Sequence, residues 1–106
     1  MSNLLFICSK NQWRSPTAEV LFKNHAVHNA KSAGTGKKAR IKVTEKLLLW
    51  ADVVFVMERR HKQLVKEHFP LTLVSKELIV LDIEDDYGFG DSKLIEILTE
   101  KLSDYL

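Results

Sequence analysis

The chain has 106 residues and a mass of 12.2 kDa, with 45% hydrophobic and 28% charged residues and a formal net charge of +2. This length suits one domain, so we expect a single domain over residues 1–106. The one cysteine, Cys8, excludes an intrachain disulfide and a cysteine-rich zinc site. No apolar run is long enough to span a bilayer, and residues 4–8 are too few for a signal peptide. These features favour a reduced, cytoplasmic protein with no membrane partner.

Charge is distributed unevenly along the chain. Residues 1–76 contain 14 Lys or Arg against 5 Asp or Glu, whereas residues 77–106 contain 2 against 9. Two interpretations stay open: the charges lie on solvated faces, or a basic surface attracts an anion and the fold brings acidic groups close to it.

Strands and helices alternate in the sequence pattern. Continuous apolar or β-branched runs predict strands over residues 3–8, 31–33, 52–57 and 77–81. Helical spacing predicts helices over about 44–50 and 59–69, and a last helix capped by Asp91. The apolar face of that last helix consists of Leu94, Leu98, Leu102 and Tyr105. The alternation predicts a parallel sheet covered on both faces, with ligands bound at the carboxyl ends of its strands.

The first helix follows directly on a polar turn. Ser15 and Pro16 are a preferred N-cap and a preferred first helical residue. Together with apolar residues at helical spacing they predict a helix from about residue 16 to about residue 29. Those apolar residues are Ala18, Leu21, Phe22 and Ala26.

The turn before this helix contains a candidate nucleophile and a candidate anion site. Cys8 ends the first strand, and Arg14 follows after five residues. The backbone N–H groups of such a turn and the helix dipole can hold a tetrahedral anion, and a guanidinium fits two phosphate oxygens. The same field would stabilise a Cys8 thiolate, which can attack a bound phosphoryl group and form a phosphocysteine. The simpler alternative is that Cys8 is a buried small hydrophobic residue.

Several segments resemble one enzyme family. Residues 4–19 resemble the opening of the low-molecular-weight protein tyrosine phosphatases, and further similar segments are 32–35, 51–59, 61–62 and 81–87. The resemblance is greatest to a short bacterial branch of predicted phosphatases in that superfamily. Together with the alternation of strands and helices, it implies a three-layer, doubly wound α/β fold. The implied four-stranded parallel sheet has the flavodoxin-like order 2-1-3-4.

The resemblance also implies roles for individual residues. Cys8 would be the nucleophile, and Arg14 would bind the phosphoryl group and stabilise the transition state. Asp85 would be the general acid that protonates the leaving group and then activates water. Asn11 would hold the loop and Ser15 would stabilise the thiolate. The other members of the phosphate-binding set are Ser9, Lys10, Gln12 and Trp13.

Two loops depart from the family pattern. Asp82 and Asp86 lie beside Asp85 and are alternative acids or loop supports, and a solvated acidic loop is the simpler interpretation of all three. Tyr87, Phe89 or Trp13 is a candidate wall of the substrate pocket. The stretch between Thr35 and Thr44 is shorter than in full-length members of the family, where it forms such a wall.

We therefore predict a cytoplasmic phosphomonoester hydrolase of the protein tyrosine phosphatase type. Its partners would be a phosphorylated protein or small aryl phosphate, and inorganic phosphate or other oxyanions, and it would need neither metal nor cofactor. The alternatives are a non-catalytic phosphate- or phosphotyrosine-binding module and, less favoured because it needs further thiols, an arsenate reductase. A nucleic-acid partner is disfavoured, because the basic stretch 37–42 has no interleaved aromatic residues. We interpret four histidines as ordinary surface residues: His25, His28, His61 and His68.

Overall fold

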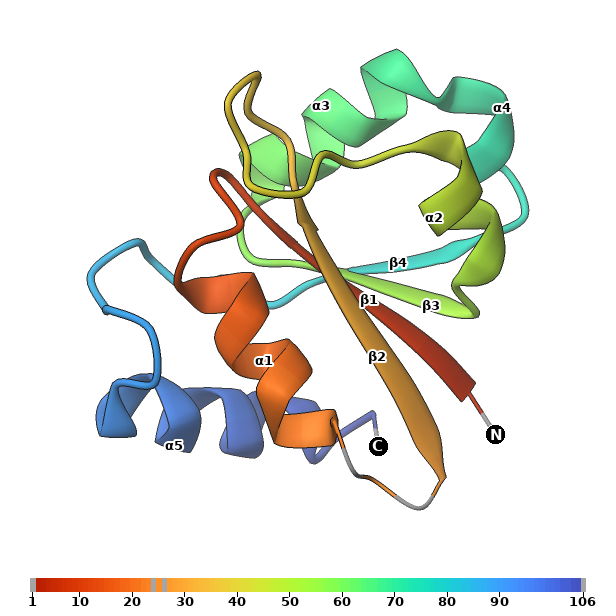
Figure 1. Ribbon diagram of the computed structural model, residues 1–106. Helices are drawn as coiled ribbons and strands as arrows, with labels where there is room; N and C mark the ends of the chain where they lie inside the picture. The colour runs from red at the N-terminus through yellow and green to blue at the C-terminus, as the bar shows by residue number, and fades with distance from the viewer. Residues whose placement is uncertain (1, 24, 26, 106) are drawn as a thin grey trace.

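Nine helices and strands alternate around one parallel sheet in the part of the chain that the computed structural model describes, residues 2–23, 25 and 27–105 (Figure 1). The strands are β1 (Ser2–Cys8), β2 (His28–Gly34), β3 (Val53–Val56) and β4 (Glu77–Val80). The helices are α1 (Arg14–Phe22), α2 (Glu45–Trp50), α3 (Arg59–His68), α4 (Pro70–Leu73) and α5 (Ser92–Leu102). No helix in these described ranges is long and apolar enough to cross a membrane.

The sheet has the order β2-β1-β3-β4, and every neighbouring pair is parallel. Helices α1 and α5 cover one face, and α2, α3 and α4 cover the other (Figure 1). The predicted α/β fold, its three layers and its strand order 2-1-3-4 are therefore confirmed. Because all four strands run the same way, their carboxyl ends lie at one edge of the sheet.

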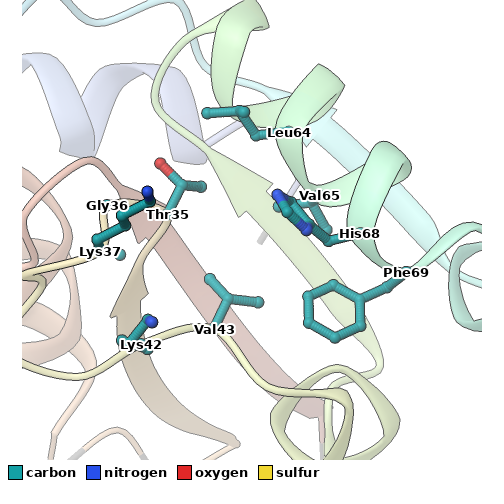
Figure 2. A pocket seen from close by; sticks show the side chains of 10 residues that line it. Thr35, Gly36, Lys37, Lys42, Val43, Leu64, Val65, His68 and Phe69 are labelled. Atoms are coloured by element: carbon teal, nitrogen blue, oxygen red, sulfur yellow. The ribbon is translucent and has the colours of Figure 1, made fainter.

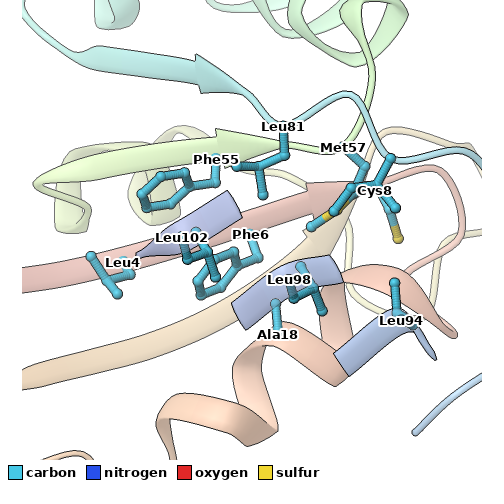
Figure 3. Packing of buried hydrophobic residues seen from close by; sticks show 11 residues of the cluster. Leu4, Phe6, Cys8, Ala18, Phe55, Met57, Leu81, Leu94, Leu98 and Leu102 are labelled. Carbon is cyan, nitrogen blue, oxygen red and sulfur yellow. The ribbon is translucent and has the colours of Figure 1, made fainter. Parts of the chain in front are cut away.

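The central strand β1 is buried on both faces, as its continuous apolar run predicts. Leu4, Phe6 and Cys8 pack with residues of α1 and α5 (Figure 3). Leu5 and Ile7 pack with residues of α2, α3 and α4 on the opposite face. The ring of Phe6 stacks on that of Phe55, with ring centroids 5.3 Å apart. Two-sided burial fixes β1 firmly, and it places Cys8 at the edge where the core meets the loops.

The first helix differs from the prediction at both ends. It begins at Arg14 rather than at residue 16, with Trp13 as N-cap, and Ser15 lies inside it with its hydroxyl turned toward Cys8. It also does not reach residue 29, because β2 begins at His28 and pairs along its whole length with β1. Strand pairing has thus overridden the helical spacing. Asn24 and Ala26, which the predicted helix included, lie outside the described residues, as do Met1 and Leu106.

The remaining elements lie close to their predicted positions. Thr44 caps α2 through a hydrogen bond from the Leu47 amide, and Asp91 caps α5. The short helix α4 was not predicted; Pro70 begins it, as proline suits a first helical turn. Tyr105 lies beyond α5 and is half exposed, so it does not continue the apolar face of that helix, although its ring contacts Phe55.

Candidate active site

A small polar hollow lies at the carboxyl end of β1. It has a volume of about 10 Å³ and is bounded by the turn after Cys8, by Arg14 at the start of α1, and by Asp85 from the loop after β4. The turn residues that line it are Ser9, Lys10, Gln12 and Trp13. The fold thus brings together residues that are more than 70 positions apart in the sequence. Of the three loop aspartates, Asp85 is the one among the lining residues.

A chain of hydrogen bonds supports the Cys8 thiol from below. Its Sγ lies 2.9 Å from the Ser15 hydroxyl, which accepts a hydrogen bond of 2.9 Å from the Asn11 amide. The same Asn11 amide donates to Ser32 Oγ at 2.8 Å, and Ser32 donates to the Glu19 carboxylate. With Cys8 as a thiol, either Sγ or Ser15 Oγ can donate across the 2.9 Å contact, and Ser15 can donate to the Ala33 carbonyl at 3.3 Å; a thiolate has no proton, so Ser15 is then the donor to Sγ. The arrangement supplies a hydrogen-bond donor to a Cys8 thiolate.

The turn is held in shape by residues at both of its sides. Asn11 has φ 56°, in the left-handed region that asparagine tolerates better than most residues. Arg40 donates from its backbone to the Lys10 carbonyl at 3.0 Å and from Nε to the Asn11 carbonyl at 3.0 Å. Gly34 lets the two loops approach, since a Cβ there would come within 2.6 Å of the Ser9 carbonyl oxygen. No local sequence pattern indicates that Arg40, 29 positions from Asn11, supports this turn.

Arg14 is buried, with only 2% of its surface exposed, and its guanidinium is fixed on one nitrogen. Nη1 donates to the Glu58 carboxylate and, at 2.8 Å, to the Ile83 carbonyl oxygen. On the side of the hollow, Nε lies 3.7 Å from Asp85 Oδ1. A buried cation without such partners would be costly, so this anchoring explains how Arg14 keeps its charge and orientation.

Glu58 links Arg14 to the surface. Its two oxygens accept from Arg60, at 3.2 Å each, as well as from Arg14. The hydrogen bonds from Arg60, followed by the contact with Arg14, lower the pKa of Glu58 to about 2, although partial burial opposes the shift. The predicted strand over residues 52–57 places Glu58 at the carboxyl edge of the sheet, but the sequence pattern assigns no role to this residue. Its partner Arg14 is 44 positions away, and no local pattern carries that information.

His61 is fully buried, contrary to its interpretation as a surface histidine. Its Nδ1 accepts from the Glu58 amide at 3.0 Å and forms a capping box at the start of α3. The neutral ring therefore carries its proton on Nε2, which donates to Ser9 Oγ at 2.8 Å. Burial, and then the cations Arg14 and Arg60, lower the pKa of His61 to about 4.

The buried neutral His61 makes stability sensitive to acid. Folding keeps the ring neutral, whereas in the unfolded chain it takes up a proton as the pH falls below 6.5. The unfolded state then binds more protons, so the free energy of unfolding falls as the pH goes from 6.5 to 4. We expect a loss of about 2 kcal/mol between pH 7 and pH 5, measured by urea unfolding. His61→Asn, which keeps an acceptor near the Nδ1 position and cannot titrate, should flatten this dependence.

His68 provides the matched control, because it is an exposed histidine on the same helix. His68→Asn should leave the pH dependence of the wild type intact. Equal flattening by both substitutions would contradict the assignment to His61.

The other candidate residues of the acidic loop lie outside the hollow. Asp82 and Asp86 are exposed, and Asp82 has φ 59°. Tyr87, a candidate substrate wall, packs against the core and lines a different cavity beside α5. The aromatic residue that does line the hollow is Trp13. The described residues contain no group of three or more His, Cys, Asp or Glu arranged to hold a metal ion.

The chain is similar to known proteins in part of its sequence and in its fold. Residues 3–49 match the family model described as low molecular weight phosphotyrosine protein phosphatase. A search of proteins of curated function finds no match. The structure is similar to that of the YwlE arginine phosphatase from Geobacillus stearothermophilus, with 22% identity, a TM-score of 0.74, and coverage of 97% of this chain and 87% of that one.

Two further structures extend the comparison. The tyrosine phosphatase Wzb from Escherichia coli K30, in complex with phosphate, has 20% identity, a TM-score of 0.77, and coverage of 99% and 96%. A cysteine-to-serine mutant of YwlE arginine phosphatase, with its active-site serine phosphorylated, has 25% identity, a TM-score of 0.68, and coverage of 97% of both chains.

The structure thus shares its fold with these phosphatases, and it holds a cysteine and an arginine on one turn at the end of its central strand. The sequence similarity to this family covers residues 3–49, and the similarity of fold extends over nearly the whole chain.

Proposed function

We propose that the chain hydrolyses phosphorylated side chains, with phosphotyrosine as the leading substrate class, through a phosphocysteine on Cys8. One observation carries the proposal. The Cys8 thiol, the buried Arg14 and the Asp85 carboxylate border one hollow, and a hydroxyl donor lies directly behind the thiol. The phosphorylated serine in the similar arginine phosphatase mutant supports the same covalent route.

The first half of the reaction transfers the phosphoryl group to sulfur. The Cys8 thiolate attacks phosphorus, an S–P bond forms, and the P–O bond to the leaving phenol breaks. Asp85 gives its proton to the leaving oxygen. Arg14, fixed through Nη1, binds equatorial phosphoryl oxygens with the donors of Nε and Nη2, and the amides of the turn bind the rest.

The second half releases phosphate. Water attacks the phosphocysteine, and the Asp85 carboxylate takes its proton. The S–P bond breaks, inorganic phosphate leaves, and the Cys8 thiolate is restored with the Ser15 hydroxyl as its donor. Positive charge for both steps comes from Arg14 and the backbone of the turn, so protein groups alone can carry the mechanism.

The choice of phosphotyrosine rests on Trp13, an aromatic residue at the mouth of the hollow, half exposed and able to pack against a phenyl ring. Phosphoarginine is the second candidate, supported by the similarity to the YwlE arginine phosphatases. Release of inorganic phosphate from p-nitrophenyl phosphate, a phosphotyrosine peptide and phosphoarginine tests both. A reduced enzyme that hydrolyses none of the three would contradict the proposal.

Replacing Asp85 should show whether it is the acid. Asp85→Asn is expected to lower kcat for p-nitrophenyl phosphate about 10²-fold, since general acid catalysis contributes about 10²–10⁴-fold. The loss should be larger for phenyl phosphate, because phenolate is a poorer leaving group and needs the proton more. Steady-state rates with both esters measure the difference.

The neighbouring aspartates give matched controls for this substitution. Asp82→Asn and Asp86→Asn remove the same charge from the same exposed loop, away from the hollow. Each should keep most of the activity and show no extra loss with phenyl phosphate. If Asp86→Asn instead reproduces the leaving-group effect, the acid is Asp86.

A further inference from the structure

A second, much larger cavity lies on the α3 side of the sheet, between the loop 35–43 and helix α3 (Figure 2). Its volume is about 530 Å³, within the range of binding pockets for small ligands or for a few side chains. We call it the side groove. Its walls include Thr35, Lys37, Lys42 and Val43 from the loop, Leu64 from α3, and Phe69 from the C-cap of that helix.

The side groove combines an apolar floor with a basic rim. Val43 and Phe69 face each other across it, with Val65 beneath (Figure 2). Lys37 and Lys42 are exposed on the loop side, and His68 lies on the helix side. No lining residue is acidic, and the stretch 35–44 contains four Lys or Arg and no Asp or Glu. A complementary ligand would present an apolar group flanked by negative charge.

The side groove shares its loop with the phosphate-binding turn. The Thr35 amide donates to the Cys8 carbonyl oxygen at 2.9 Å, and the Gly36 amide donates to that of Ser9 at 2.9 Å. Both ends of this loop meet at Gly34, which donates to the Ile41 carbonyl at 2.8 Å and accepts from the Val43 amide at 3.0 Å. These hydrogen bonds close the loop on itself. The turn after Cys8 lies on one side of the loop, and the side groove lies on the other.

The two cavities differ greatly in size. The hollow at Cys8 has a volume of about 10 Å³, about enough for one water molecule, so it offers no surface to the rest of a substrate protein. Selection among phosphorylated proteins must then come from residues outside the hollow, and the side groove is a large concave surface whose loop is hydrogen-bonded to the turn after Cys8.

We propose that the side groove binds an acidic segment of the phosphorylated substrate protein, with an apolar side chain on the groove floor and carboxylates against Lys37 and Lys42. This inference rests on the proposed phosphatase function and adds a substrate class to it. The enzyme should therefore prefer phosphorylated residues that lie near Glu or Asp and an aliphatic side chain.

The test compares two peptides and a small ester. One peptide has a central phosphotyrosine flanked by Glu and Leu, and the other has Lys in place of each Glu. For wild type, kcat/KM should be about tenfold higher for the acidic peptide. In the double variant Lys37→Glu/Lys42→Glu, the ratio of kcat/KM for the acidic peptide to that for p-nitrophenyl phosphate should fall about tenfold, the effect of reversing two exposed charges.

The matched control changes net charge equally on the other face of the sheet. Lys23 and Lys93 are exposed and belong to the α1 and α5 side. Lys23→Glu/Lys93→Glu should keep the wild-type ratio. An equal fall in this variant would show long-range steering by total charge and would overturn the groove as the binding site, as would equal wild-type rates for the two peptides.

Binding of the unphosphorylated acidic peptide, labelled with fluorescein and followed by anisotropy, separates this inference from the phosphatase proposal. If p-nitrophenyl phosphate is not hydrolysed but the peptide binds wild type and not Lys37→Glu/Lys42→Glu, the catalytic proposal fails and the groove assignment stands. If the ester is hydrolysed and neither protein binds the peptide, the groove assignment fails alone. If the wild type forms a concentration-dependent dimer and Lys37→Glu/Lys42→Glu does not, the occupant of the side groove is a second copy of the chain. This result would also overturn the proposal that the groove binds an acidic substrate segment.

Discussion

Cys8→Ser is expected to lower phosphatase turnover by about 10⁴-fold or more, the usual scale for loss of a catalytic nucleophile. A serine hydroxyl fits the space of the thiol, and it would still lie beside the Ser15 hydroxyl. It ionises far less readily than a thiol, however, so the turn would hold a neutral alcohol below the phosphoryl group where the mechanism needs an anion. The measurement is phosphate release from p-nitrophenyl phosphate under reducing conditions.

Two controls accompany this substitution. The melting temperature should stay close to that of wild type, because the hydrogen bonds of Asn11, Ser15 and Ser32 do not depend on the sulfur. Inorganic phosphate should still bind, measured by calorimetry, because Arg14 and the backbone of the turn are unchanged. Residual turnover above about one per cent in a correctly folded Cys8→Ser protein would mean that another group is the nucleophile, whatever its effect on binding.

Arg14→Lys is expected to lower kcat by about 10²–10³-fold, the loss typical of removing a preorganised transition-state donor. A lysine ammonium can reach the Glu58 carboxylate, but it offers a point charge instead of a planar fork. The single anchored nitrogen of Arg14 leaves the rest of the guanidinium facing the hollow, and lysine has no such second edge. The effect should fall mainly on kcat, because charge on the phosphoryl oxygens is redistributed in the transition state.

Arg60→Lys is the control for this substitution. Arg60 binds the same Glu58 carboxylate from the exposed side, with about half of its side chain in solvent. Exposed ion pairs contribute at most about 1 kcal/mol, so the change in kcat should stay below about fivefold. Equal losses for Arg14→Lys and Arg60→Lys would mean that Arg14 acts only through Glu58.

Some features of the site follow from the sequence because they are local. The apolar run before Cys8 identifies a strand buried on both faces. Cys8 and Arg14 are separated by the length of one turn. The hydrogen-bond donors of this turn are consecutive backbone amides, so an anion site can be inferred without knowing the fold. The alternation of strands and helices then fixes the parallel sheet, because right-handed crossovers leave few other arrangements.

Other features depend on contacts between distant segments. The sequence offered three neighbouring aspartates in one loop, and the backbone path after β4 brought Asp85 to Arg14. His61 is buried at the start of α3, where its ring contacts Ser9 of the turn after Cys8, 52 positions away in the chain. The sequence by itself indicated the strands and most of the helices, without α4 and without the ends of α1, and it pointed to one turn where a nucleophile could meet an anion. Tertiary structure decided which charges hold Arg14, which histidine is buried and where the side groove lies. These outcomes depend on the distances between segments that are far apart in the sequence, and no local pattern encodes those distances.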